Sequence, residues 1–119
     1  MVVLCCGDRN WTDTAAIAAE FARRPEITTV VHGACRGADR LCAEAAEAAR
    51  CVVVAEPADW TRYGRAAGPM RNQRMLDLYP IDLVLAFHAD LGSSKGTADM
   101  VARARRRGVP VVVVTGDPK

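Results

Sequence analysis

The chain has 119 residues, half of them apolar and a quarter charged, which is the composition of one globular domain. Its formal net charge of +2 is too small to indicate wholesale nucleic-acid binding, and no apolar run approaches the length of a membrane span. Five cysteines form no C-x-x-C pair, and there is no secretory signal, so we expect a cytoplasmic protein with reduced thiols and no metal site.

Short continuous apolar runs alternate with alanine-rich stretches along the chain. The runs predict five strands, at residues 2–6, 28–31, 51–55, 83–87 and 109–114. Continuous rather than alternating hydrophobicity is typical of strands that are buried on both faces of a parallel sheet.

The stretches between these runs predict four helices, at residues 13–24, 36–50, 69–78 and 97–107. In the second helix we expect Leu41, Ala45 and either Ala48 or Ala49 to lie on one side, because they recur at helical spacing. Residues 56–67 have no clear periodicity and are expected to form a long irregular loop, which in a compact domain is usually functional or mobile.

The alternation of strands and helices predicts an α/β fold of the Rossmann-like, doubly wound type. Right-handed crossovers turn this order into a five-stranded parallel sheet, for which we expect the strand order 3-2-1-4-5 in a single domain over residues 1–119. The last strand is expected at an edge, since Pro110 suits an edge or the start of a strand. Ligands of such sheets bind beyond the carboxyl ends of the strands, where the strand order reverses.

Four turns that this fold gathers at that edge contain glycine beside Arg, Lys, Ser, Thr or Asn: residues 6–11, 31–39, 67–72 and 93–97. Glycine lets backbone N–H groups approach an anion, and a helix N-terminus adds unpaired donors and a positive dipole end. The turns and the loop therefore predict a site for a phosphorylated ligand. Its expected binding residues are Gly7, Arg9, Trp11, Gly33, Arg36, Gly37, Asp39, Trp60, Gly68, Arg71, Asn72, Ser94, Gly96 and Thr97.

Several of these residues have a structural alternative. Asp39 either bonds a ribose hydroxyl or stabilises the first turn of its helix. Arg36 and Arg71 lie in predicted first turns, where a cation opposes the helix dipole, so an anionic partner is favoured over a structural ion pair. Trp11 and Trp60 either stack on a base or fold back onto the core.

Together these motifs resemble the SLOG superfamily, which includes the Lonely Guy phosphoribohydrolases and the DprA/Smf DNA-processing proteins. The resemblance rests on residues 7–11, 32–39, 58–60, 64, 67–72 and 96–100, and it is strongest to the small YspA/YpsA-related branch of bacteria and their phages. It implies a nucleotide-derived ligand of the ADP-ribose, NAD or nucleoside phosphate type, with no required cofactor. It also implies a homodimer.

Two positions depart from the phosphoribohydrolases in this resemblance. Those enzymes use an Arg-Lys pair and a Glu that follows a glycine-rich turn. Arg71 matches the Arg, but Asn72 and Met100 stand in place of the Lys and the Glu. A carboxylate stabilises positive charge that develops on the ribose, whereas a thioether does not. We therefore expect a sensor or regulatory module that binds its ligand without turnover.

Two other functions remain open at this stage. One is an N-glycosidic-bond hydrolase of nucleotides, in which Asp8, Asp39 or Asp99 replaces the missing Glu and Arg71 assists catalysis. The other is a single-stranded DNA-binding module, which is disfavoured because the chain lacks an extended basic stripe with interleaved aromatic residues.

Overall fold

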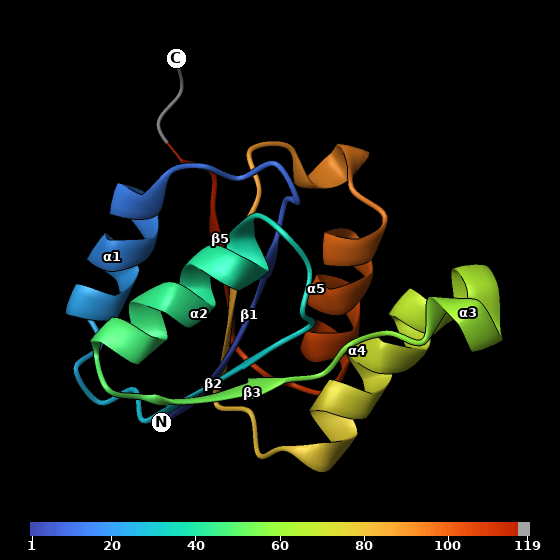
Figure 1. Ribbon diagram of the computed structural model, residues 1–119, viewed down its shortest axis with the longest axis horizontal. Coiled ribbons are helices and arrows are strands. Elements are labelled where there is room, and N and C mark those ends of the chain that lie inside the picture. The colour runs from blue at the N-terminus through green and yellow to red at the C-terminus, as the bar shows by residue number, and fades with distance from the viewer. Residues whose placement is uncertain (117–119) are drawn as a thin grey trace.

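The computed structural model describes residues 1–116 and confirms the Rossmann-like α/β fold. One parallel sheet has the strand order β3-β2-β1-β4-β5, as the sequence predicts (Figure 1). The strands are β1 Val2–Gly7, β2 Thr29–His32, β3 Val52–Ala55, β4 Leu83–Phe87 and β5 Val111–Val114. The order reverses between β1 and β4, which lie side by side with Val3 opposite Leu83 and Gly7 opposite Phe87.

Helices cover both faces of this sheet. Alternate residues of β1 point to opposite sides, so Val3 and Cys5 pack against α1 and α2, while Leu4 packs against α4 and α5. The helical elements are α1 Thr14–Ala22, α2 Ala38–Ala48, α3 Trp60–Tyr63, η1 Gly64–Ala66, α4 Ala67–Leu78, η2 Leu91–Ser93 and α5 Gly96–Arg106. None of the helices in residues 1–116 has the length and apolar character needed to cross a membrane.

The side of α2 that carries Leu41 and Ala45 packs at the margin of the core, but it is not the most buried side of the helix. Leu41 and Ala45 are only half-buried, and Ala48 and Ala49 are exposed. The fully buried apolar residues recur every four positions instead, at Ala38, Cys42 and Ala46. These small side chains let α2 pack closely on β1, whereas the prediction followed the larger Leu41 to the flank of the helix.

The expected irregular loop at residues 56–67 is also wrong over most of its length. It contains the short helix α3 and the 3-10 turn η1, which runs directly into α4. Asp59 begins α3, since its side chain accepts a hydrogen bond from the backbone N–H of Arg62 at 3.1 Å. Figure 1 shows α3 standing beside α4, away from the sheet.

The last strand was predicted at residues 109–114, but it begins at Val111, two residues later than predicted. Pro110 has no N–H to donate, and its carbonyl accepts a hydrogen bond from Val84 just before β5 begins at Val111. β5 is an edge strand, as expected.

Candidate functional site

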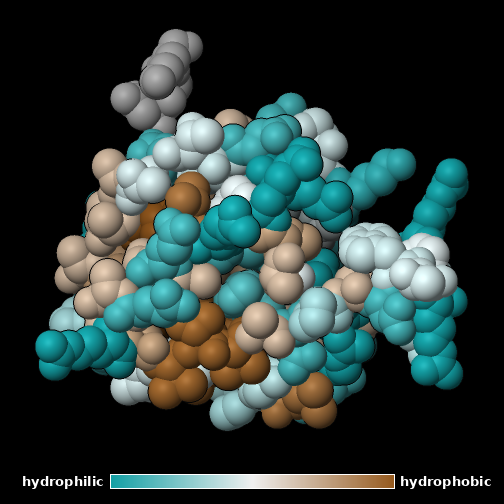
Figure 2. Space-filling model, in the orientation of Figure 1, coloured by the Kyte–Doolittle hydropathy of each residue, from teal (hydrophilic) through white to brown (hydrophobic). Residues whose placement is uncertain are grey.

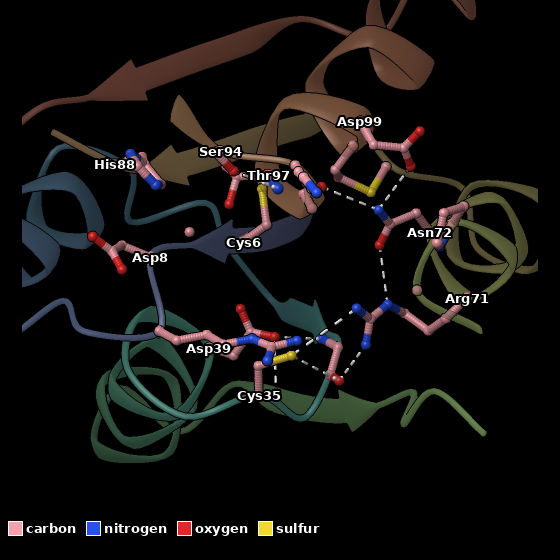
Figure 3. Close-up of a pocket in the computed structure, with 18 of the residues that line it drawn as sticks. Cys6, Asp8, Cys35, Asp39, Arg71, Asn72, His88, Ser94, Thr97 and Asp99 are labelled. Atoms are coloured by element: carbon pink, nitrogen blue, oxygen red, sulfur yellow. Dashed lines mark hydrogen bonds between the residues drawn. The ribbon is translucent and has the colours of Figure 1, made fainter. Parts of the chain in front are cut away.

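A cavity of about 770 Å³ opens at the carboxyl ends of the strands (Figure 3). Its walls come from the β1–α1 turn, the β2–α2 turn, the segment from α3 into α4, and the β4–α5 turn. The last strand residues of β1 meet its floor, so the cavity lies where the strand order reverses. Parallel topology thus brings four distant segments of the chain to one edge.

All the predicted ligand-binding residues except Trp11 and Gly37 line this cavity. Asp99, a candidate catalytic residue, lines it as well. The residues from the predicted set are Gly7, Arg9, Gly33, Arg36, Asp39, Trp60, Gly68, Arg71, Asn72, Ser94, Gly96 and Thr97.

Trp11 belongs to the core and not to the cavity. It is 7% exposed, its ring meets Phe87 edge-on with the ring centroids 5.7 Å apart, and its Nε1 donates to the Asp13 carbonyl at 2.9 Å. The prediction that Trp11 binds ligand is therefore not supported by its position. Trp11 instead follows the alternative interpretation, in which a loop tryptophan folds back onto the core.

Gly37 positions the cavity wall without lining it. Its φ of +73° is disfavoured for any residue with a side chain, and a Cβ there would collide with the backbone of Asp8 and Arg9. This close approach allows the Ala38 N–H to donate to the Asp8 carbonyl at 3.0 Å. Gly37 thus fixes the start of α2 against the β1–α1 turn.

The carboxylate of Asp39 occupies the backbone donors of the β2–α2 turn. Asp39 is 5% exposed, and its Oδ2 accepts hydrogen bonds from the N–H groups of Gly33 at 3.0 Å and Cys35 at 3.2 Å. Burial raises the pKa of this carboxyl to about 6, although these hydrogen bonds and the Arg71 charge oppose the shift. The structural role of Asp39 is therefore to hold the β2–α2 turn, through N–H groups that precede its helix, and not the hydrogen bonding of the first helical turn. A phosphate would not find these two N–H groups free.

Arg71 is a buried cation beside the same turn. Its side chain is on the wall of the cavity, the residue is 7% exposed, and its Nη1 donates to the Gly33 carbonyl at 2.5 Å. Its Nε donates to Asn72 Oδ1 at 3.0 Å. The expectation that Arg71 lies in a first helical turn was wrong, because α4 begins at Ala67 and places Arg71 in the second turn. Its burial, rather than the helix dipole, is what makes its charge costly.

Asn72 links this arginine to the opposite helix. Asn72 Nδ2 donates to Asp99 Oδ2 at 3.0 Å and to the Gly96 carbonyl at 3.3 Å. The same Asp99 oxygen accepts a hydrogen bond from Arg103 Nε at 2.8 Å. Figure 3 shows the resulting chain of contacts from Arg71 through Asn72 to Asp99. One oxygen of Asp99 is therefore held by the protein itself.

Five cationic side chains line the cavity without a carboxylate partner. Within residues 1–116, none of them forms an ion pair at 4.0 Å or less, whereas five arginines elsewhere do. The unpaired set is Arg9, Arg36, Arg65, Arg71 and Lys95. The cavity therefore carries more cations than carboxylates, since only Asp8, Asp39 and Asp99 line it as well, and none of the five cations is in direct contact with a carboxylate of the described residues.

Three helices direct their N-termini to this cavity, and none has a side chain bonded at its cap position. The cap residues are Gly37 for α2, Ala66 for α4 and Lys95 for α5. By contrast, Asp13 caps α1 and Asp59 caps α3. In α5 one donor is satisfied, since Ser94 Oγ accepts from the Thr97 N–H at 3.0 Å. Such N-termini leave N–H donors and a positive dipole end that favour an anion, most clearly in α2 and α5. In α4 fewer donors remain, because the Ala67 N–H donates to the Gly64 carbonyl of η1 and Pro69 has no N–H.

Sequence reasoning missed several lining residues. Those outside the predicted set are Cys6, Asp8, Asn10, Cys35, Arg65, Pro69, Met75, His88, Lys95, Asp99 and Met100, of which only Asp8 and Asp99 were weighed as catalytic substitutes. Lys95 lies inside a predicted turn, so its charge was a usable signal. Arg65 was hidden in the segment mistaken for an irregular loop. In residues 1–116 no group of three His, Cys, Asp or Glu side chains is placed to hold a metal ion.

Comparison with known proteins gives two matches. The profile of the YspA, cpYpsA-related SLOG family matches residues 1–63, which run from β1 to the end of α3. This chain belongs to that family. It is also 36% identical over 119 aligned residues to the Gene 61 protein of Mycobacterium phage D29, an alignment that covers 92% of this chain and 93% of the phage protein. No solved structure matches the chain significantly.

Membership of the SLOG family indicates a nucleotide-related function. The matched residues carry the β1–α1 and β2–α2 turns, while α4 and the β4–α5 turn lie beyond them. In this SLOG protein Met100 is 1% exposed and lines the cavity beside Asp99. A thioether therefore occupies the wall where the resemblance places the Glu of the phosphoribohydrolases.

Proposed function

We propose that this SLOG family protein binds a nucleotide or nucleotide-derived phosphorylated ligand in the cavity at the carboxyl ends of its strands. The class of ligand is ADP-ribose, NAD or a nucleoside phosphate, and the protein acts as a sensor or regulatory module without a required cofactor. The observation that carries the proposal is the set of five unpaired cations around one cavity.

The buried guanidinium of Arg71 supports an anionic ligand most directly. A charge that is removed from water is costly unless it is paired, and within residues 1–116 Arg71 has carbonyl, amide and thiol neighbours but no carboxylate within 4.0 Å. Among the described residues, the one hydrogen-bond partner of its Nη2 is the Cys35 sulfur, at 4.0 Å. A phosphate oxygen would give this group a charge-assisted hydrogen bond.

The size and the chemistry of the cavity support a nucleotide rather than an inorganic anion. Ligand pockets are usually about 300–1,000 Å³, and this cavity, at about 770 Å³, is much larger than a phosphate needs. The uncapped N-terminus of α5, with Lys95 and Thr97 beside it, offers a second group of donors across the cavity from Arg71.

Calorimetric titration of the purified protein with ADP-ribose, AMP and adenosine tests this proposal. ADP-ribose and AMP should bind, and adenosine should bind at least tenfold more weakly, because it lacks the phosphate. Arg71→Ala should weaken phosphate binding, whereas Arg105→Ala, an exposed cation near the C-terminal end of α5, should not change it. Equal affinities for AMP and adenosine would rule out phosphate recognition.

A second candidate function is hydrolysis of the N-glycosidic bond of a nucleotide. It is favoured by one observation: the buried Asp39 carboxyl lines the cavity with its pKa raised to about 6, so it could hold a proton for a leaving base near neutral pH. Met100 and the engaged Asp99 favour binding without turnover. Chromatography of an overnight reaction with AMP separates the two functions. Release of adenine that Asp39→Asn abolishes would favour the hydrolase.

The proposal includes a homodimer in the cytoplasm, where nucleotides are abundant and thiols stay reduced. β3 is an open edge strand within the described chain, and its Val52 is 61% exposed. Figure 2 shows hydrophobic residues gathered over β3, low on the visible face. Exposed apolar area next to an open strand edge is typical of a pairing surface. Light scattering coupled to gel filtration measures the mass, and Val52→Lys should shift it towards the monomer.

A further inference from the structure

Two side chains from opposite walls meet across the cavity. The guanidinium carbon of Arg9, on the β1–α1 turn, lies 5.7 Å from the centroid of the Trp60 ring, on α3. Both residues line the cavity. The indole rests on α4, since a Cβ at Gly68 would lie 3.1 Å from Trp60 Cη2. Trp60 is nevertheless 47% exposed, so it contributes a large apolar ring that folding does not cover.

Trp60 differs in this respect from the other aromatic side chains in residues 1–116. Trp11 and Phe87 are buried in the core, and the partly buried Phe21 packs against that core and does not line the cavity. The Tyr79 hydroxyl donates to a carboxylate oxygen of Glu56, and Tyr63, although exposed, stands over Arg62 and does not line the cavity. Trp60 is therefore the Trp, Tyr or Phe ring that this part of the chain presents to a ligand.

The separation of Arg9 from Trp60 fits a replaceable contact. The distance of 5.7 Å from the guanidinium carbon to the ring centroid is near the outer limit of about 6 Å for a cation–π contact, so this contact is loose. A base held between the two groups needs them about 7–8 Å apart, since flat groups stack at about 3.5–4 Å. Arg9 is exposed and forms no ion pair with a carboxylate of residues 1–116, so its guanidinium is free to move outward by an ångström or two.

We propose that Trp60 and Arg9 form a clamp that stacks on the nucleobase of the phosphorylated ligand. The indole packs on one face of the base, and the guanidinium covers the other. The inference rests on the proposed function and adds an orientation to it. The base lies between the β1–α1 turn and α3, and the phosphate extends towards Arg71 and the N-terminus of α5. Ligands that carry a flat aromatic base are thereby selected over sugar phosphates.

Paired titrations with four nucleoside monophosphates and with ribose 5-phosphate test the clamp. At least one of AMP, GMP, CMP and UMP should bind at least tenfold more tightly than ribose 5-phosphate. Trp60→Ala should remove most of that advantage and leave the affinity for ribose 5-phosphate unchanged within about twofold. Arg9→Ala should also remove most of that advantage, and because Arg9 is one of the five cations of the cavity, it should lower the affinity for ribose 5-phosphate as well, by a smaller factor. Tyr63→Ala is the matched control, because it removes an exposed aromatic ring of the same helix that does not line the cavity.

Intrinsic fluorescence supplies an independent readout, since Trp11 and Trp60 are the two tryptophans of the chain. A stacked base should quench the Trp60 component, which Trp60→Phe identifies by difference, while ribose 5-phosphate should not.

Circular dichroism of each variant verifies that the fold is intact. If ribose 5-phosphate binds as tightly as every nucleotide, the clamp is wrong and the proposed function stands. If no phosphorylated compound binds, both are wrong.

Discussion

Asp39 and Arg71 hold the two backbone polar groups of one residue, Gly33, without forming an ion pair with each other. Asp39 Oδ2 accepts the Gly33 N–H at 3.0 Å, and Arg71 Nη1 donates to the Gly33 carbonyl at 2.5 Å. A carboxylate from α2 and a guanidinium from α4 are thus joined through the β2–α2 turn. A change in either side chain should therefore be felt by the turn and by the cavity that the turn lines.

The raised pKa of Asp39 should make the contribution of this residue to stability fall as the pH rises. Its carboxyl titrates near 3.8 when unfolded and at about 6 when folded, so between these values the folded state binds more protons than the unfolded state. The Asp39 contribution to the free energy of unfolding should therefore decrease from about pH 4 to pH 6, by an amount on the order of 2–3 kcal/mol.

Urea unfolding of the wild type and of Asp39→Asn between pH 4 and pH 7 measures this contribution. The amide retains an oxygen that accepts the Gly33 and Cys35 N–H groups, but it does not titrate. The difference in free energy between the two proteins should therefore change across this range. Parallel curves would show that Asp39 is not the group responsible.

Gly33→Ala should displace Arg71. A Cβ at this position would lie 2.7 Å from Arg71 Cζ, which is too close for any real contact. We expect a loss of about 1–3 kcal/mol in the free energy of unfolding and a weaker affinity for AMP. Gly92→Ala is the control, because its Cβ would meet only Asp90 Oδ1 at an ordinary 3.6 Å. Denaturant titration and calorimetry of both variants provide the comparison, and wild-type binding by Gly33→Ala would contradict the role given to Arg71.

The sheet could be predicted from the sequence because its determinants are local. Continuous apolar runs indicate buried parallel strands, and the right-handedness of the crossover connections then leaves few possible strand orders. The segment at residues 56–67 could not, because α3 depends on the Asp59 cap and on packing against α4, and it is too short to show a period. The buried face of α2 was missed for a similar reason, since alanine and cysteine face the sheet in preference to Leu41.

The sequence predicted which turns meet at the site, but not which hydrogen-bonding atoms of those turns remain free for a ligand. Glycine and arginine in the turns indicated an anion, and most of the indicated residues line the cavity. Nothing in the sequence shows that Asp39 occupies the donors of Gly33 and Cys35, or that Trp11 turns into the core. These outcomes depend on tertiary contacts between segments that are separate in sequence.

Arg36 should affect ligand binding without affecting stability. The side chain of Arg36 is exposed and lines the cavity, and Arg36 immediately precedes Gly37, the cap residue of α2. It forms no ion pair with a carboxylate of residues 1–116. Without ligand, Arg36→Ala should change the free energy of unfolding by less than about 0.5 kcal/mol. With AMP it should lose a charge-assisted contact of about 1.5–3 kcal/mol, which is roughly ten- to a hundredfold in affinity. Arg105→Ala should change neither quantity, and a melting temperature lowered by Arg36→Ala would assign Arg36 to the fold.

The affinity for ADP-ribose should rise as the pH falls from about 7.5 to 5.5. Asp39 lines the cavity and is ionised above its pKa of about 6, so at neutral pH its negative charge repels a bound diphosphate. Protonation removes that repulsion, and we expect about a three- to tenfold gain in affinity, because a like charge nearby shifts a pKa by about one unit.

ADP-ribose is the appropriate probe because its diphosphate does not titrate in this range, unlike the terminal phosphate of AMP. Asp39→Asn should bind with the acid affinity at every pH, whereas His88→Asn, which removes another titratable group of the cavity wall, should retain the wild-type dependence. If His88→Asn abolishes the pH dependence and Asp39→Asn does not, the histidine controls it.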